Sequence, residues 1–444
     1  MDPGQVAYDD RIADQVSGFS SRGPSKNGAL KPDISAPGSG ILSAAMGRGT
    51  AGASFSGTSM AGPMVAGTAA LIHHRNRVER LGLGADDLGA MLMNYARPVI
   101  YQDPATRAAL STARQGSGLV DIWQAAKGRF VARSGDIASL NLGAVALSAP
   151  ASLRGSVTLR GLDRSPDARP LRLALSLDKP GDSGYGPGVR VILPRSPVVL
   201  GPGETVSLEL RFDVDPAALP AWSLYPAPPI GSAAAIAGHE VAGHLRITPV
   251  DDAGQPVADA PPASLPFYLL PRKASAFRAS PLAPAAGADA GSLRLENHGQ
   301  PGLAEVFLVP RQGLVGGQSA APSASEDPDE AAVLHELDLR RVGLRLLPGA
   351  EGKGPRLELA IARHEAAAIS HVTEFAVYID SDRDLKPDHV LREAVVEGRR
   401  QVQAAGWDPS LNGGRGEVIS GTLRIDQTGH RTDQHTRLTV LSAP

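Results

Sequence analysis

A short segment in the N-terminal part of the chain combines a glycine turn, a serine and a long apolar run. Residues 54–67 read SFSGTSMAGPMVAG, and small or apolar side chains continue with few interruptions from Met60 to Ile72. A helix that is apolar nearly all round is typically buried on all sides. This run therefore predicts a buried helix that begins at Ser59. No histidine precedes the segment, and the first one in the chain is His73.

Ser59 is a candidate nucleophile because of its place at the start of this helix. Its backbone N–H belongs to the unpaired donors at the positive end of the helix dipole. Such a donor can stabilise an oxyanion that forms beside the hydroxyl. Serine is also a favoured cap of ordinary helices, so these residues alone leave both readings open.

A nucleophilic serine needs a base to take up its proton. His73 follows Ser59 by fourteen residues and His74 by fifteen. Along a helix this is about 21 Å, which is far beyond hydrogen-bond reach. The later histidines, beginning with His239, fall in β-rich regions. The chain is therefore expected to carry only half of an active site.

Five ordered motifs surround this serine. They are FSSRGP at residues 19–24, KPDISAPG at 31–38, GTSMAGP at 57–63, LMNYA at 92–96 and QGSGLVD at 115–121. Together they closely resemble the C-terminal half of the catalytic domain of subtilisin-like serine proteases, the peptidase S8 family. The resemblance implies a partial α/β domain over residues 1–127, with an incomplete parallel sheet. It also implies that Ser59 is the acyl nucleophile and that its N–H is one oxyanion donor.

The sequence departs from the family upstream of the serine. In the family, the catalytic Asp, the catalytic His and an oxyanion Asn all precede it, and their motifs are not found in residues 1–58. The candidate aspartates in that region lie outside the family's strand-then-glycine context: Asp9, Asp10, Asp14 and Asp33. We therefore expect this chain to be inactive alone and to need the missing N-terminal half as a partner. Without that half, residues 1–127 should expose an apolar helix and a sheet edge.

Other elements are predicted within the first 127 residues. Strand candidates are Val16 to Ser20 and Ile41 to Ala44. A second helix has an apolar face at i, i+3, i+4 and i+7, is capped by Asp86 or Asp87, and must end before Pro98.

After Trp123 the pattern changes to period two, which is typical of strands. The predicted strands cover residues 153–159, 171–177, 189–193, 206–214, 241–247 and 265–270. They predict a β-sandwich over residues 128–272. Its position resembles that of the fibronectin-type-III-like domain that follows the catalytic domain in large subtilases. The resemblance implies a domain that positions the protease or contacts protein substrates, and a plain spacer is the alternative.

A third, β-rich domain is predicted over residues 273–444, with an acidic disordered segment at 316–332. One turn carries alternate carboxylates, which can converge on a hard cation such as Ca²⁺: Asp380, Asp382, Asp384 and Asp388. The alternative is a solvated acidic turn, neutralised by Arg383 and Lys386.

Composition excludes several classes of protein. The 444 residues include no cysteine, so thiol chemistry, disulfides and cysteine metal sites are ruled out. A net charge of −2 lacks the excess of positive charge that is typical of nucleic-acid-binding proteins. There is no apolar stretch of about 18 residues, so no membrane span is expected. The start of the chain lacks signal-peptide features, whereas the family resemblance implies a secreted or cell-surface location.

The sequence thus predicts the C-terminal portion of a secreted subtilisin-like serine endopeptidase, a fragment that acts on protein or peptide substrates only when complete. No cofactor is expected to be required, and calcium at the acidic turn is the one candidate ligand. A first alternative is a non-catalytic binding or structural protein that retains the protease scaffold. A second is another hydrolase with a G-x-S-x-G elbow, which the β-rich downstream chain disfavours.

Overall fold

The computed structural model describes most of the chain. The described residues are 15–25, 29–98, 110–165, 167–178, 185–221, 238–280, 293–302, 304, 306–308, 339–348, 355–367, 376–379, 384, 386–396, 399–408, 410, 417–419, 429–432 and 436–443. They form two compact units. Unit 1 comprises residues 1–222 and 231–302, and unit 2 comprises residues 223–230 and 303–444.

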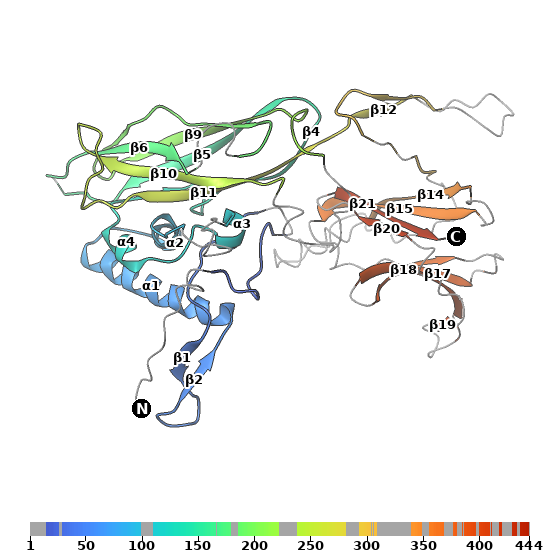
Figure 1. Cartoon of the computed structure of the whole chain (residues 1–444), viewed down its shortest axis with the longest axis horizontal. Coiled ribbons are helices and arrows are strands. Elements are labelled where there is room, and N and C mark those ends of the chain that lie inside the picture. Colours follow the sequence, from blue (N-terminus) through green and yellow to red (C-terminus); the bar gives the residue numbers. More distant parts are fainter. Residues whose placement is uncertain are drawn as a thin grey trace. The chain divides into compact units, whose positions relative to one another are not determined.

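Unit 1 begins with a hairpin and four helices (Figure 1). The hairpin pairs β1 (Ile41–Ala44) with β2 (Gly52–Phe55) in antiparallel fashion. The helices are α1 (Thr58–Val78), α2 (Ala85–Asn94), α3 (Thr112–Gln115) and α4 (Ile122–Lys127). The predicted helix at Ser59, the second helix and the strand at residues 41–44 are therefore confirmed.

Two details of these predictions are wrong. Residues 16–20 form no strand; Gln15 makes an isolated bridge and a turn follows. The N-cap of α2 is Gly84, and the two aspartates lie inside its first turn. There, a carboxylate still interacts favourably with the helix dipole.

The rest of unit 1 is dominated by a β-sandwich of residues 130–273, called the sandwich below. One sheet has the order β3-β5-β9-β7 and the other β4-β11-β10-β6-β8. The strands are β3 (Phe130–Arg133), β4 (Leu140–Leu147), β5 (Ala151–Gly161), β6 (Leu171–Leu177), β7 (Val189–Ile192), β8 (Val198–Leu200), β9 (Thr205–Val214), β10 (Val241–Val250) and β11 (Ala263–Lys273). All six strands predicted in this region are confirmed, whereas β3, β4 and β8 were missed. A short antiparallel pair, β12 (Phe277–Ala279) and β13 (Leu295–Asn297), ends the unit.

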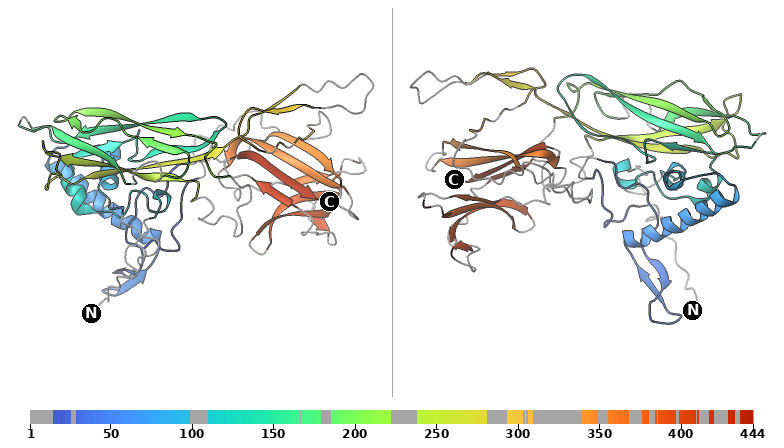
Figure 2. Two further views of the ribbon diagram at one scale, coloured as in Figure 1. Left: turned by 45° about the horizontal axis from the view of Figure 1, so that its top comes forward. Right: turned by 180° about the vertical axis from the view of Figure 1, so that it is seen from behind.

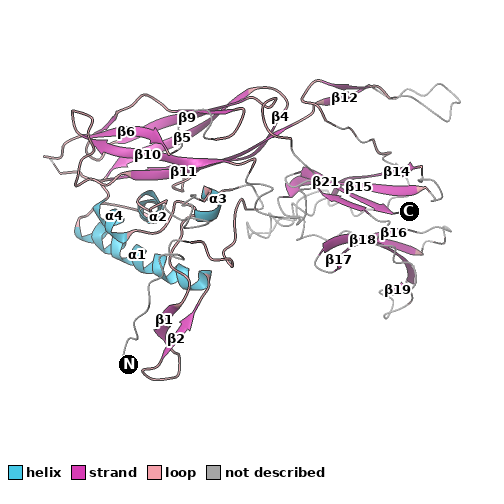
Figure 3. Ribbon diagram, viewed as in Figure 1, coloured by secondary structure: helices cyan, strands magenta, loops and turns pink. Residues whose placement is uncertain are grey.

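The alternation seen in the sequence places one face of each strand in the core. In β9, Leu208, Leu210, Phe212 and Val214 are buried between the sheets. The rings of Phe212 and Phe267 meet edge to face in this core. The helices cover one face of the sandwich (Figure 3), and α2 joins the same buried cluster.

The described residues of unit 2 form two four-stranded antiparallel sheets (Figure 2). Their orders are β14-β15-β21-β20 and β16-β17-β18-β19. The strands are β14 (Leu339–Leu347), β15 (Arg356–Ala367), β16 (Ala376–Ile379), β17 (His389–Val396), β18 (Arg399–Asp408), β19 (Glu417–Ile419), β20 (Gly429–Thr432) and β21 (Thr436–Ala443). The predicted β-rich character is confirmed here, while residues 316–332 lie outside the described residues.

The molecule is thus mostly β, with several sheets and few helices. Among the described residues of the first 127, the only strands are those of the antiparallel hairpin. Isolated bridges add a parallel pair, Ser35 with Leu119, and an antiparallel pair, Arg97 with Leu119. The domain boundaries at residues 127/128 and 272/273 stay predictions. None of the described helices has both the length and the apolarity that a membrane span requires.

Candidate active site

Ser59 is the second residue of α1, directly after the helix start. The N-cap Gly57 is extended, with φ 162° and ψ 163°. Its carbonyl accepts hydrogen bonds from the N–H groups of Met60 (3.0 Å) and Ala61 (3.4 Å). The N–H of Ser59 precedes these donors, and its side chain is exposed. Ser59 is therefore an exposed residue at the positive end of the helix dipole.

The loop before Ser59 is held by close backbone contacts. The N–H of Gly57 donates to the carbonyl of Gly38 at 2.8 Å. A Cβ on Gly38 would lie 2.8 Å from the Gly57 carbonyl oxygen and 3.2 Å from the Cβ of Ala61. Only glycine permits this approach at position 38 without displacing the helix start.

A second layer fixes the segment that carries Gly38. Ser35 N–H donates to the Gly118 carbonyl (2.9 Å), and Val120 N–H donates to the Ser35 carbonyl (2.8 Å). Gly116 has φ +63°, and its Cβ would lie 2.5 Å from the backbone of Asp33. The motifs at residues 31–38, 57–63 and 115–121 are therefore packed against one another.

The structure corrects the prediction that α1 is buried on all sides. Its only buried residues are Thr68 and Ile72. Three large apolar side chains are exposed along one stripe at seven-residue spacing: Met64 (41%), Leu71 (57%) and Val78 (66%). The inner side of α1 contacts α2 and α4, and no described residue covers the stripe. The expectation that an apolar helix would be exposed in this chain is confirmed.

No hydrogen bond joins Ser59 to an imidazole within the described part of the chain. His73 and His74 are exposed on α1. A buried imidazole with an acidic partner lies in the sandwich, where Nδ1 of His244 is 3.0 Å from Oδ2 of Asp178. The Tyr185 hydroxyl donates to Oδ1 of the same carboxylate at 3.0 Å. Sequence reasoning missed this cluster, because nothing in the spacing of its members signals their contact.

The electrostatics of this cluster favour an ionised aspartate. Burial disfavours the charged form of Asp178, but its hydrogen bonds with His244 and Tyr185 outweigh burial and hold its pKa below the usual value. The Asp178–His244 pair orients the ring inside the sandwich and has no contact with the Ser59 loop.

The predicted calcium residues are only partly described. Asp380 and Asp382 lie outside the described residues. Oδ1 of Asp384 accepts from the Lys386 N–H at 2.8 Å, and the Asp388 N–H donates to the Ile379 carbonyl at 2.9 Å. No group of three potential metal ligands occurs among the described residues. The calcium site stays a prediction.

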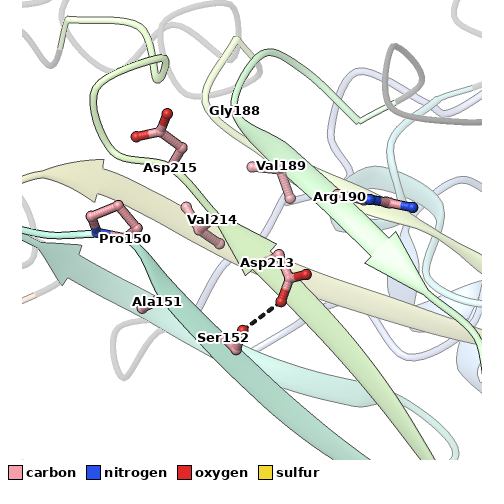
Figure 4. A pocket seen from close by; sticks show the side chains of 9 residues that line it. All are labelled: Pro150, Ala151, Ser152, Gly188, Val189, Arg190, Asp213, Val214 and Asp215. Atoms are coloured by element: carbon pink, nitrogen blue, oxygen red, sulfur yellow. Dashed lines mark hydrogen bonds between the residues drawn. The ribbon is translucent and has the colours of Figure 1, made fainter.

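A cavity of about 560 Å³ opens at one end of the sandwich, where β5, β7 and β9 meet (Figure 4). Ser152 donates to Asp213 at 2.5 Å in its wall. Arg190 and Asp215 also line it. None of the predicted site residues lines this cavity. In the sequence, its polar residues cannot be told from ordinary solvent-facing positions of strands.

Comparison with known proteins identifies the segment that carries Ser59. Residues 6–119 match the family described as Subtilase family, Peptidase_S8. This segment is therefore subtilase-like in sequence. A PII-type proteinase of Lactococcus lactis subsp. cremoris is 38% identical over 120 residues, which cover 24% of this chain and 6% of the relative. Pyrolysin of Pyrococcus furiosus is 38% identical over 109 residues, covering 24% and 8%.

A C5a peptidase of Streptococcus pyogenes is 34% identical over 110 residues, covering 24% of this chain and 9% of the relative. The matched subtilase region thus spans less than a tenth of the length of these relatives. Two solved structures that match the chain, at 8% and 11% sequence identity, have TM-scores of 0.20, which is too low to indicate a shared fold.

Proposed function

We propose that this chain is the C-terminal portion of a secreted or cell-surface subtilisin-like serine endopeptidase that hydrolyses peptide bonds through Ser59. The observation that carries the proposal is the exposed Ser59 at the start of α1, inside a segment of subtilase sequence. A helix start supplies the donor that an acyl-transfer site needs.

Residues 1–127 are, in this proposal, a partial α/β subtilisin-like domain whose parallel sheet is completed by an N-terminal half. The exposed stripe of α1 supports this, because an apolar surface of that kind marks a site of protein contact. The β1–β2 hairpin adds exposed Leu42 and Phe55. The sandwich and unit 2 are then two β-sandwich-like domains, of which the first is fibronectin-type-III-like.

The chemistry assigned to this chain is the nucleophilic half of the reaction. Oγ of Ser59 attacks the peptide carbonyl carbon, and the oxyanion that forms accepts a hydrogen bond from the Ser59 N–H. The C–N bond breaks, the protonated amine leaves, and water hydrolyses the serine ester. The base, the acid behind it and a second oxyanion donor come from the N-terminal half. Loss of the base lowers turnover in enzymes of this type by about six orders of magnitude.

A fluorophosphonate probe, which reacts with activated serines, tests this proposal. The chain alone should show no labelling above that of its Ser59→Ala variant. When a subtilase N-terminal half with its Asp, His and Asn motifs is supplied, labelling should appear and should again be abolished by Ser59→Ala. Ser54→Ala is the matched control, because Ser54 lies on β2 just before the loop, and labelling should persist in it.

Two outcomes contradict the proposal in different ways. Ser59-dependent labelling of the chain alone would show that the base is already present. Binding of the N-terminal half without any labelling would favour the alternative, a non-catalytic binding or structural protein on a protease scaffold.

A further inference from the structure

The N-terminal segment (residues 15–127) and the sandwich share one hydrophobic core within unit 1. Met91 of α2 and Tyr95, the residue that caps its C-terminal end, are buried in the same cluster as Phe130. The hydroxyl of Tyr95 donates to the Phe130 carbonyl at 2.9 Å. A Cβ on Gly128 would lie only 2.3 Å from the Tyr95 ring. Separation of α2 from the sandwich would therefore expose core side chains on both sides.

Asn94, the last residue of α2, satisfies backbone groups of two sandwich strands. It is fully buried, its Oδ1 accepts from the Ala132 N–H at 2.8 Å, and its Nδ2 donates to the Ser264 carbonyl at 3.2 Å. Ala132 lies on β3 and Ser264 on β11, so one side chain bridges both sheets. Buried backbone groups need such partners.

A buried carboxylate of the sandwich holds two further parts of the N-terminal segment. The Glu240 side chain is 2% exposed and forms an ion pair with Arg22 at 2.5 Å. Its other oxygen accepts from the Ser111 hydroxyl, and Oε1 also accepts from Tyr268, both at 3.2 Å. Burial and the charge of Glu240 raise the pKa of Tyr268, which keeps the phenol protonated as a donor.

The contacts of Glu240 continue through the backbone to the serine loop. Next to Arg22, the Gly23 N–H donates to the Ala113 carbonyl in α3 at 2.8 Å. The segment after α3 then pairs with residues 33–35, which lead to Gly38 and to the start of α1. Two neighbouring residues of the FSSRGP motif thus make these links: Arg22 pairs with Glu240 of the sandwich, and Gly23 is hydrogen-bonded to α3.

We propose that the sandwich is the folding partner of the N-terminal segment, which adopts its structure only when docked against β3 of one sheet and β10 and β11 of the other. Glu240 and Asn94 set the register of that docking. The sandwich is then neither a spacer nor a separate substrate-binding module. This inference does not depend on Ser59 being a nucleophile.

Amide hydrogen exchange of the full 444-residue chain tests the proposal. Glu240→Ala leaves Arg22 buried without its carboxylate, and removal of one partner of a buried ion pair is strongly destabilising. We expect exchange to rise roughly 100-fold or more in residues 20–24, 111–120 and α2, while the sandwich strand β9 keeps its protection. The matched control is Glu209→Ala, which removes the exposed partner of Arg154 and should change exchange less than about fivefold.

A milder variant covers the case in which Glu240→Ala does not fold. Tyr268→Phe removes one donor to Glu240 and should raise exchange of the same segments by roughly 2- to 10-fold. Equal protection of those segments in Tyr268→Phe and in the wild type would overturn the proposal. So would a Glu240→Ala chain whose N-terminal segment exchanges no faster than in Glu209→Ala. Both readouts are independent of proteolytic activity, so failure of the proposed function would leave them unchanged.

Discussion

At the scale of residues, glycines determine how closely the motifs of the N-terminal segment approach one another. Gly116 has φ +63° and backbone atoms of Asp33 within 2.5 Å of its Cβ position. Gly89, inside α2, has open space around it. The same substitution should therefore act in opposite directions at these two positions.

We expect Gly116→Ala to destabilise unit 1 by more than about 1 kcal/mol, because alanine strains a left-handed backbone and collides with residue 33. Gly89→Ala should stabilise it by about 0.5–1 kcal/mol, because alanine favours a helix interior. Urea unfolding of both variants checks the pair. A Gly116→Ala chain as stable as the wild type would contradict the packing described above.

Acid sensitivity follows from the depressed pKa of Asp178. Above its ordinary pKa of 3.8, the ionised carboxylate stabilises the fold through His244 and Tyr185. Because the unfolded state takes up the proton first, this contribution is lost as pH falls from 3.8 through the lower folded pKa. Asp178→Asn should remove that part of the pH dependence in urea titrations below pH 4. An unchanged slope would exclude the role of this pair.

The sequence predicted the place of Ser59 at a helix start, because glycine, serine and the apolar run are local signals. The contacts of Glu240 and Asp178 were not predictable in this way. Arg22 and Glu240 are separated by 218 positions, and Asp178 and His244 by 66. Such pairs depend on strand register, which a single sequence does not specify.

At the scale of elements, α1 has two apolar faces with different neighbours. Ile72 is 1% exposed and faces the core, while its neighbour Leu71 is 57% exposed on the stripe. Because α1 is apolar on all sides, its sequence predicted burial but could not indicate which face of the helix is exposed to solvent in this chain. Short strands such as β3 and β8 were missed because three or four residues carry too little alternation.

These adjacent residues provide a matched test. Leu71→Ala should change the free energy of unfolding by no more than about 0.5 kcal/mol, whereas Ile72→Ala should lower it by about 2–5 kcal/mol. Leu71→Glu should in addition weaken binding of a subtilase N-terminal half, measured by calorimetric titration. Equal losses of stability at the two positions would mean that the stripe is covered.

At the scale of the whole molecule, the two compact units predict separable stability. A chain that ends after Gly302 retains the described residues of unit 1. We expect it to unfold at the same temperature as unit 1 does in the full chain, measured by scanning calorimetry. A lower midpoint in the shortened chain would show that unit 2 contributes to the stability of unit 1.

Most strands of the sandwich could be predicted at this scale, because period-two alternation and Pro/Gly turns are strong local signals there, whereas β17 to β21 of unit 2 were not predicted. The sharing of one core between α2 and the sandwich could not. Both the helix and the strands showed apolar faces, but nothing in the sequence indicated that Tyr95 and Phe130 would fill the same space.

The pairing of β4 with β11 has a mechanical consequence. These strands lie side by side and run parallel over seven residue pairs, with a shift of register between Tyr268 and Leu269. Tension that enters at the start of β4 and leaves at the end of β11 would load those hydrogen bonds in shear, so that they must break together rather than one after another. A sandwich tethered at both ends in this geometry is built to resist stretching.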